Sequence, residues 1–172
     1  MSSSPYTARE ELANSLTHGA GIIASIVGAV MLIGLASAAG TIEVVAVSVF
    51  AASLILLYSA STLYHTSRDE KARSRLKVFD HCAIYVLIAG TYTPFTLVGL
   101  RGRWGWSLFG VIWGLAAAGV VFKLFFTGRF KRVSTGIYIA MGWLIVIAAA
   151  PTVRALAPAT LAWLLAGGIA YT

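Results

Sequence analysis

Long apolar runs separated by short polar segments dominate the chain. An α-helix crosses the roughly 30 Å hydrocarbon core of a bilayer with about 20 mostly apolar residues. We expect five complete membrane-spanning helices, at residues 16–39, 44–64, 78–100, 104–126 and 134–153. A sixth run starts at residue 158 and reaches residue 172. At 1.5 Å per residue it would span only about 22 Å, so we expect the sequence to be truncated within this sixth helix.

The composition is typical of a chain whose solvent is largely lipid. Of the 172 residues, 59% are apolar and only 11% are charged, and the mean hydropathy is +0.85. Soluble proteins carry about 25% charged residues. The sequence therefore predicts an all-α integral membrane protein with a single transmembrane domain over residues 1–172 and no large soluble domain.

The net charge of +7 would suggest nucleic-acid binding in a soluble chain. Here the basic residues lie outside the apolar runs or at their edges, as topology signals do. Given six spans, ten of the 13 fall on the side of the N-terminus: Arg9, Arg68, Lys71, Arg73, Arg75, Lys77, Lys123, Arg129, Lys131 and Arg132. The positive-inside rule then predicts a multi-pass protein of the cell membrane with a cytoplasmic N-terminus. We expect no nucleic-acid partner.

A secretory signal is the competing interpretation of the first run, because Ala36-Ser37-Ala38 resembles a cleavage site. Glu10 and Glu11 lie just before the run, and the run is longer than a signal core, so we expect a retained helix.

Two features predict helix shape and packing. Pro94 removes a backbone hydrogen bond inside the third run and should kink or loosen that helix near Gly90. Gly110 and Gly114 have the small-xxx-small spacing that lets two helices approach closely.

Ionisable residues in or beside membrane helices are the first candidates for function. The candidates are Glu11, Asn14 and His18 around the start of the first run, Ser61 and His65 at the end of the second, and Asp80 and His81 at the start of the third. The first three share a helix face within about 60°, and Ser61 and His65 are stacked one turn apart. Asp80 and His81 are about 100° apart and cannot both point the same way.

All these groups are predicted at the same side of the membrane, on different helices. They could converge on a metal site or polar reaction centre, or they could simply lie at the interface. His18, His65 and Asp80 could supply three metal ligands, but the chain contains no His-x3-His pair on one helix. Both interpretations stay open on spacing alone.

Three ordered motifs closely resemble the bacterial hemolysin III family. They are Glu11-x2-Asn14-x2-Thr17-His18-Gly19, Ser61-x3-His65, and Phe79-Asp80-His81-Cys82-Ala-Ile-Tyr85 leading to Ala89-Gly-Thr-Tyr-Thr-Pro-Phe95. That family belongs with the adiponectin and progestin receptor relatives, a group of seven-helix membrane proteins with a cytoplasmic N-terminus. The resemblance implies a seven-transmembrane-helix bundle in the bacterial inner membrane.

In the wider group, the resemblance implies a zinc ion near the cytoplasmic face. Its ligands are the histidine of Ser-x3-His and two histidines of a His-x3-His motif at the start of the seventh helix. Carried over, His65 is a zinc ligand, Asp80 lies beside the zinc-bound water, and Ser61 lies near that water. This chain stops before the seventh helix, so two ligands are missing and zinc should not be held firmly. Glu11, Asn14 and His18 are expected to form a structural polar cluster at the cytoplasmic mouth.

The function implied is zinc-dependent hydrolysis of lipid amides such as ceramides by the full-length protein, with membrane lipids as partners and a lipid as substrate. A cytolytic, pore-forming protein and a non-catalytic membrane receptor are the alternatives. A small transporter, or a haem or quinone binder using His65, is less favoured. A pore needs a continuous polar face and a haem site needs histidines near mid-bilayer, whereas the polar groups here lie at helix ends. The substrate, the physiological role and the oligomeric state are not indicated.

Overall fold

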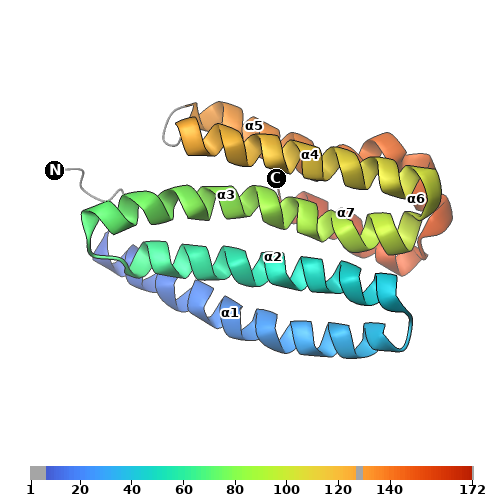
Figure 1. Ribbon diagram of the computed structural model, residues 1–172, viewed down its shortest axis with the longest axis horizontal. Coiled ribbons are helices and arrows are strands. Elements are labelled where there is room, and N and C mark those ends of the chain that lie inside the picture. Colours follow the sequence, from blue (N-terminus) through green and yellow to red (C-terminus); the bar gives the residue numbers. More distant parts are fainter. Residues whose placement is uncertain (1–6, 127–129, 172) are drawn as a thin grey trace.

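The protein forms an elongated bundle of helices in a computed structural model that describes residues 7–126 and 130–171 (Figure 1). Every regular element in these two ranges is helical. The α-helices are α1 (Ala8–Ser37), α2 (Thr41–Thr66), α3 (Glu70–Pro94), α4 (Gly102–Phe126), α5 (Lys131–Gly142), α6 (Ala149–Ala155) and α7 (Pro158–Tyr171). A π-helical segment, η1 (Phe95–Leu100), follows α3, and a 3-10 segment, η2 (Leu144–Ala148), precedes α6.

Five helices are long and apolar enough to cross a membrane, as the sequence predicts. In the described part of the chain they are Ala8–Ser37, Thr41–Thr66, Glu70–Leu100, Gly102–Phe126 and Arg132–Ala155, and α7 is a shorter apolar helix. Large apolar side chains such as Ile23, Val30 and Leu35 are exposed along α1, which suits a surface that faces lipid. The all-α, multi-pass membrane architecture is confirmed. The seven-helix count and the cytoplasmic N-terminus stay predictions.

Helix α3 lies between α2 and α4 and forms the centre of the bundle (Figure 1). In the most apolar stretch of Glu70–Leu100, 50% of the residues are buried inside the bundle, whereas in that of α1 only 11% are. The main hydrophobic core gathers around it, with Tyr85, Ile88, Ala89 and Tyr92 from α3, Ile112 and Ala116 from α4, and Met141 from α5. Residues on α3 can therefore reach both halves of the bundle.

Two helices begin well before their apolar runs because side chains cap them. Thr7 and Glu10 form a reciprocal capping box at the start of α1, in which the Glu10 amide donates to Thr7 Oγ1 over 3.3 Å. Asp69 caps α3 by accepting from the Ala72 amide over 2.7 Å. Asp80 therefore lies in the third turn of α3 and not at its start, so the expected position of Asp80 at the helix end is wrong. The apolar runs therefore predict which residues lie in the membrane, whereas the capping residues determine where the helices begin.

The chain changes helix type directly after Pro94. Helix α3 stays α-helical through Gly90 to Pro94, and the chain then forms η1, where the Arg101 amide donates to the Thr96 carbonyl over 3.2 Å. A Cβ atom at Gly90 would overlap Ser53 Oγ on α2. This glycine therefore allows α2 and α3 to approach closely, and the kink near Gly90 stays a prediction.

The predicted packing role of Gly110 and Gly114 is also wrong for contacts within the described chain. A Cβ atom at either position would meet nothing within 4 Å, because both face outward from α4. Close packing on α4 instead uses Gly105, beside the Thr96 carbonyl, and Gly119, beside the Tyr85 ring.

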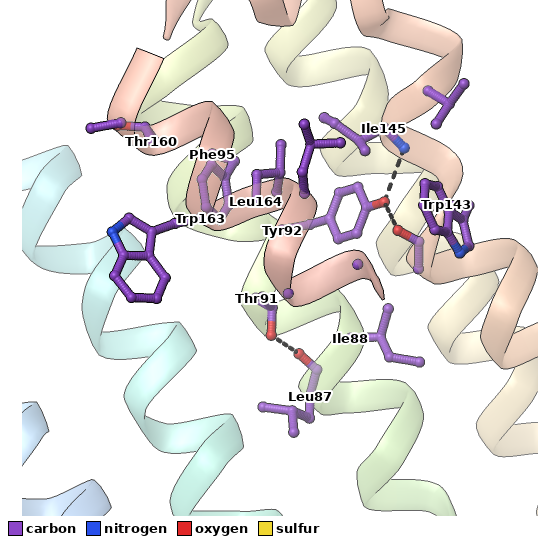
Figure 2. A pocket seen from close by; sticks show the side chains of 16 residues that line it. Leu87, Ile88, Thr91, Tyr92, Phe95, Trp143, Ile145, Thr160, Trp163 and Leu164 are labelled. Carbon is purple, nitrogen blue, oxygen red and sulfur yellow. Dashed lines mark hydrogen bonds between the residues drawn. The ribbon is translucent and has the colours of Figure 1, made fainter. Parts of the chain in front are cut away.

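The fifth membrane segment changes helix type within its apolar run. Helix α5 ends at Gly142, Trp143 leaves the helical region, and η2 follows. The Tyr92 hydroxyl spans this break by donating to the Gly142 carbonyl over 2.8 Å and accepting from the Ile145 amide over 2.9 Å (Figure 2). A tyrosine from α3 thus satisfies backbone groups that the break leaves without helical partners.

Candidate functional site

Three polar side chains from three helices meet at the end of the bundle where α1 begins, α2 ends and α3 begins (left in Figure 1). They are Glu11 on α1, His65 on α2 and Arg73 on α3. Glu11 and His65 belong to two of the sequence motifs. From the sequence, Arg73 was singled out only as one of the ten basic residues that indicate the orientation in the membrane. We call this group the Glu11–His65–Arg73 cluster.

The central contact of the cluster joins Glu11 to His65. His65 Nδ1 lies 2.6 Å from Glu11 Oε2, and the side chains are only 7% and 13% exposed, respectively. An ionised carboxylate can only accept hydrogen bonds, so Nδ1 carries the proton in this contact. The imidazole is therefore oriented by a nearly buried hydrogen bond to another helix.

Arg73 binds the other oxygen of the same carboxylate. Its guanidinium Nη2 donates to Glu11 Oε1, and its Cζ atom lies 5.1 Å from the centroid of the Tyr64 ring. Arginine can pair with a carboxylate and stack on an aromatic face at once because its guanidinium is planar. The cluster thus uses both oxygens of Glu11 and the residue that precedes His65.

The other members of the first motif lie on the same face of α1 but play different parts. His18 sits with its ring centroid 6.0 Å from that of His65 and 5.7 Å from that of Tyr58. Its Nδ1 atom is buried without a hydrogen-bond partner among the described residues. Asn14 is partly buried between Glu11 and His18. The structural polar cluster expected of these three residues stays a prediction, and the structure adds that Glu11 contacts His65 directly.

Ser61 and Asp80 lie close to this end of the bundle, on α2 and α3. Ser61 is buried one turn before His65, and the Asp80 side chain is 17% exposed. Asp80 lies within electrostatic range of His18, which brings the third motif toward the first. The neighbouring His81 is turned to its own helix, with Nδ1 2.6 Å from the Lys77 carbonyl oxygen.

The described residues contain no group of three or more His, Cys, Asp or Glu side chains that could hold a metal ion. The combination of His18, His65 and Asp80 that the spacing allowed is therefore not assembled as a ligand set. The hydrogen bond from His65 to Glu11 does fit a metal-binding histidine, because such histidines almost always donate their other ring N–H to a carboxylate, carbonyl or water. His65 as a zinc ligand stays a prediction.

A helix-phase signal could have identified Arg73 from the sequence. Arg73 and Asp80 are seven residues apart and so lie within about 20° of each other around a helix. This signal was missed because the predicted span began at residue 78. Arg73 lies before that residue and was therefore interpreted as a charged residue of a loop.

A large apolar cavity lies between α3, η2 and α7 (Figure 2), open to the surface on the side of α7, where Trp163 is 80% exposed. Its volume is about 570 Å³. Leu87 and Thr91 line it from α3, on nearly the same helix face as Asp80, and Leu87 lies only about 10 Å of helix rise from Asp80. The sequence did not indicate this cavity, because its walls come from three separate apolar segments.

Comparisons with known proteins agree with the motifs. A family profile described as "Haemolysin-III related" matches residues 6–172. The "Hemolysin-3 homolog" of Bacillus subtilis (strain 168) is 45% identical over 168 residues, which cover 97% of this chain and 79% of that protein. "Hemolysin-3" of Bacillus cereus is 49% identical over 165 residues, which cover 95% of this chain and 75% of that protein.

The chain is also similar to a human protein, "Monocyte to macrophage differentiation factor". The two are 28% identical over 144 residues, which cover 80% of this chain and 59% of the human protein. No solved structure matches the chain significantly. The profile covers nearly the whole sequence, and both Bacillus relatives align over most of their own length. The chain belongs to the haemolysin-III related family.

Proposed function

We propose that the full-length protein is a zinc-dependent hydrolase of lipid amides such as ceramides, with its reaction centre at the Glu11–His65–Arg73 end of a seven-helix bundle. The observation that carries the proposal is the nearly buried hydrogen bond from His65 Nδ1 to Glu11. This arrangement is usual for metal-binding histidines. Ser61 lies one turn before His65 on α2, and Asp80 lies two turns after Arg73 on α3.

His65 would bind the metal through Nε2, because Nδ1 donates to Glu11. The two further histidines that the resemblance implies, in a His-x3-His motif, are not among the 172 residues. Zinc, when bound, supplies a Lewis acid that lowers the pKa of water to about 7.

In this proposal Asp80 acts as general base and acid. Its carboxylate accepts a proton from the water that attacks the amide carbonyl and returns a proton to the leaving amine as the C–N bond breaks. The Ser61 hydroxyl orients the attacking water from α2. The partial burial of Asp80 keeps bulk water from competing for that proton.

The apolar cavity supports a lipid as the substrate. Its volume of about 570 Å³ falls within the range of small-molecule pockets, and its lining by side chains such as Leu87, Trp143 and Leu164 suits an acyl chain (Figure 2). Because Leu87 and Asp80 share a helix face, a chain in the cavity would place its polar end toward the reaction centre.

The test is amide hydrolysis by the full-length protein, loaded with zinc and supplied with a short-chain ceramide in detergent micelles. We expect Asp80→Asn to lower fatty-acid release by about 10²-fold to 10⁴-fold, the range for loss of a general acid–base. Asp69→Asn is the matched control, because Asn caps a helix as well as Asp does and Asp69 caps the same helix. A protein that holds zinc but hydrolyses no lipid amide would support the receptor alternative.

Cytolysis is the second candidate function. It is favoured by the names of the two Bacillus relatives, "Hemolysin-3 homolog" and "Hemolysin-3". Dye release from lipid vesicles that contain the purified protein tests it. If Asp80→Asn abolishes amide hydrolysis but leaves dye release unchanged, the two activities are separate properties of the protein.

A further inference from the structure

We propose that Glu11 and Arg73 are positioning residues for His65. Glu11 holds the imidazole in one tautomer and one orientation, so that Nε2 is the nitrogen turned toward the reaction centre, and Arg73 holds Glu11. This inference rests on the proposed function, since a fixed Nε2 matters most when that atom binds a metal.

The first step is the choice of tautomer. A neutral imidazole carries its proton on either nitrogen, and its hydrogen-bond partner decides which. Here the partner is a carboxylate oxygen 2.6 Å from Nδ1, and a carboxylate accepts but does not donate. The Nδ1–H tautomer is therefore stabilised, and the lone pair lies on Nε2.

The second step is the orientation of Glu11 itself. A glutamate has three rotatable bonds, and fixing it costs conformational entropy that a single hydrogen bond barely offsets. Arg73 binds the second carboxylate oxygen from α3 while its guanidinium lies over Tyr64 on α2. Because Tyr64 immediately precedes His65, one arginine ties the carboxylate to the same helical turn that carries the histidine.

The Glu11–His65–Arg73 cluster differs from an ordinary surface ion pair in the burial of its members. Glu43 and Arg101 form a pair at the opposite end of α2, with Arg101 Nη2 2.7 Å from Glu43 Oε1; the glutamate is 14% exposed, but the arginine is 65% exposed. Exposed pairs of this kind contribute little to stability. In the Glu11–His65–Arg73 cluster every side chain is at most 23% exposed, and the carboxylate has a histidine as its second partner.

The experiment uses full-length protein labelled with ¹⁵N at histidine, metal-free and in detergent micelles. Each histidine signal can be assigned by substituting the histidines of the full-length protein one at a time. We expect His65 to show the Nδ1–H tautomer in the unchanged protein. Glu11→Gln should give a mixture of tautomers, because an amide can either accept from Nδ1 or donate to it. Glu43→Gln is the matched control and should leave the His65 signals unchanged.

A second readout is zinc affinity. We expect Glu11→Gln to weaken zinc binding by about 10-fold to 100-fold, the effect usual when a metal-binding histidine loses its hydrogen-bond partner. Arg73→Lys, which keeps the charge but loses the planar fork, should weaken it by a smaller factor. Glu11→Asp keeps a carboxylate and should retain the Nδ1–H tautomer, so it tests the inference even if Glu11→Gln fails to fold.

The outcomes distinguish this inference from the proposed function. If Glu11→Gln changes neither the His65 tautomer nor the zinc affinity, the positioning role is overturned, while loss of zinc in His65→Ala would still support the metal site. If Glu11→Gln shifts the tautomer but His65→Ala keeps all of its zinc, Glu11 does position His65 but the proposed function fails.

Discussion

Two buried tyrosines on α3 differ in what their hydroxyl groups bind. The Tyr92 hydroxyl makes two hydrogen bonds to the backbone around the break between α5 and η2. The Tyr85 hydroxyl is fully buried, and its polar neighbours among the described residues include the side chains of Ser134 and Tyr138, with which it makes no hydrogen bond of ordinary geometry. A buried polar group without a partner costs free energy, whereas one with partners stabilises the fold.

We therefore predict that the same substitution has unequal effects at the two positions. Tyr92→Phe leaves a partly buried carbonyl and a partly buried amide without this partner and should lower the free energy of unfolding by about 1–3 kcal/mol. Tyr85→Phe should cost less than about 0.5 kcal/mol or stabilise the protein. Unfolding in mixed detergent, followed by circular dichroism, measures both, and equal losses at the two positions would contradict the assigned hydrogen bonds.

At the residue scale, the sequence predicts which residues matter better than it predicts their contacts. The motifs alone single out Glu11, His65, Ser61 and Asp80 as candidates. The pairing of Glu11 with His65 could not be predicted, because it joins residues 54 positions apart through the packing of α1 on α2. Arg73 was missed because α3 starts at Glu70, where the capping residue Asp69 and not hydrophobicity sets the helix start.

Among the elements, α4 shows how glycines of one helix serve different purposes. A Cβ atom at Gly105 would overlap the backbone carbonyl oxygen of Thr96, which cannot rotate away, whereas a Cβ atom at Gly110 would meet nothing within 4 Å. The spacing of Gly110 and Gly114 predicted a packing face, but the packing glycines lie on the other side of the helix. Spacing alone could not decide this, because it does not reveal which face of α4 contacts α3 and η1.

The prediction at this scale is a contrast between two alanine substitutions. Gly105→Ala should destabilise the protein by about 1–3 kcal/mol through overpacking. Gly110→Ala should be neutral or stabilise it by up to about 1 kcal/mol through higher helix propensity. Thermal unfolding of the two variants in the same detergent checks this, and a stable Gly105→Ala protein would mean that α4 and η1 are not in close contact.

For the whole molecule, the number of apolar helices agrees with the prediction from the sequence, whereas the orientation in the membrane stays a prediction. Hydrophobicity predicted five crossing helices and a shorter one, because burial in lipid depends on length and composition, which the sequence displays. The π turn, the broken fifth segment and the cavity arise from contacts between segments, which apolar runs do not encode. The orientation in the membrane follows only from the distribution of basic residues.

The orientation can be tested with cysteines, since Cys82 is the single cysteine among these 172 residues and is buried. In a Cys82→Ser background, Ala39→Cys probes the α1–α2 loop and Ser67→Cys probes the α2–α3 loop. The positive-inside rule predicts that a membrane-impermeant maleimide labels position 39 in intact cells and position 67 only after permeabilisation. The reverse labelling pattern would place the Glu11–His65–Arg73 cluster on the outer side.

The most direct test of the central claim is the zinc content of the purified full-length protein. We predict about one zinc per chain in the unchanged protein, near-complete loss in His65→Ala, and retention in His81→Ala, because the His81 ring is bound to its own helix. Elemental analysis after gel filtration measures this, and circular dichroism confirms that each variant is folded. A folded His65→Ala protein with unchanged zinc would contradict the account, because the metal would then lie elsewhere.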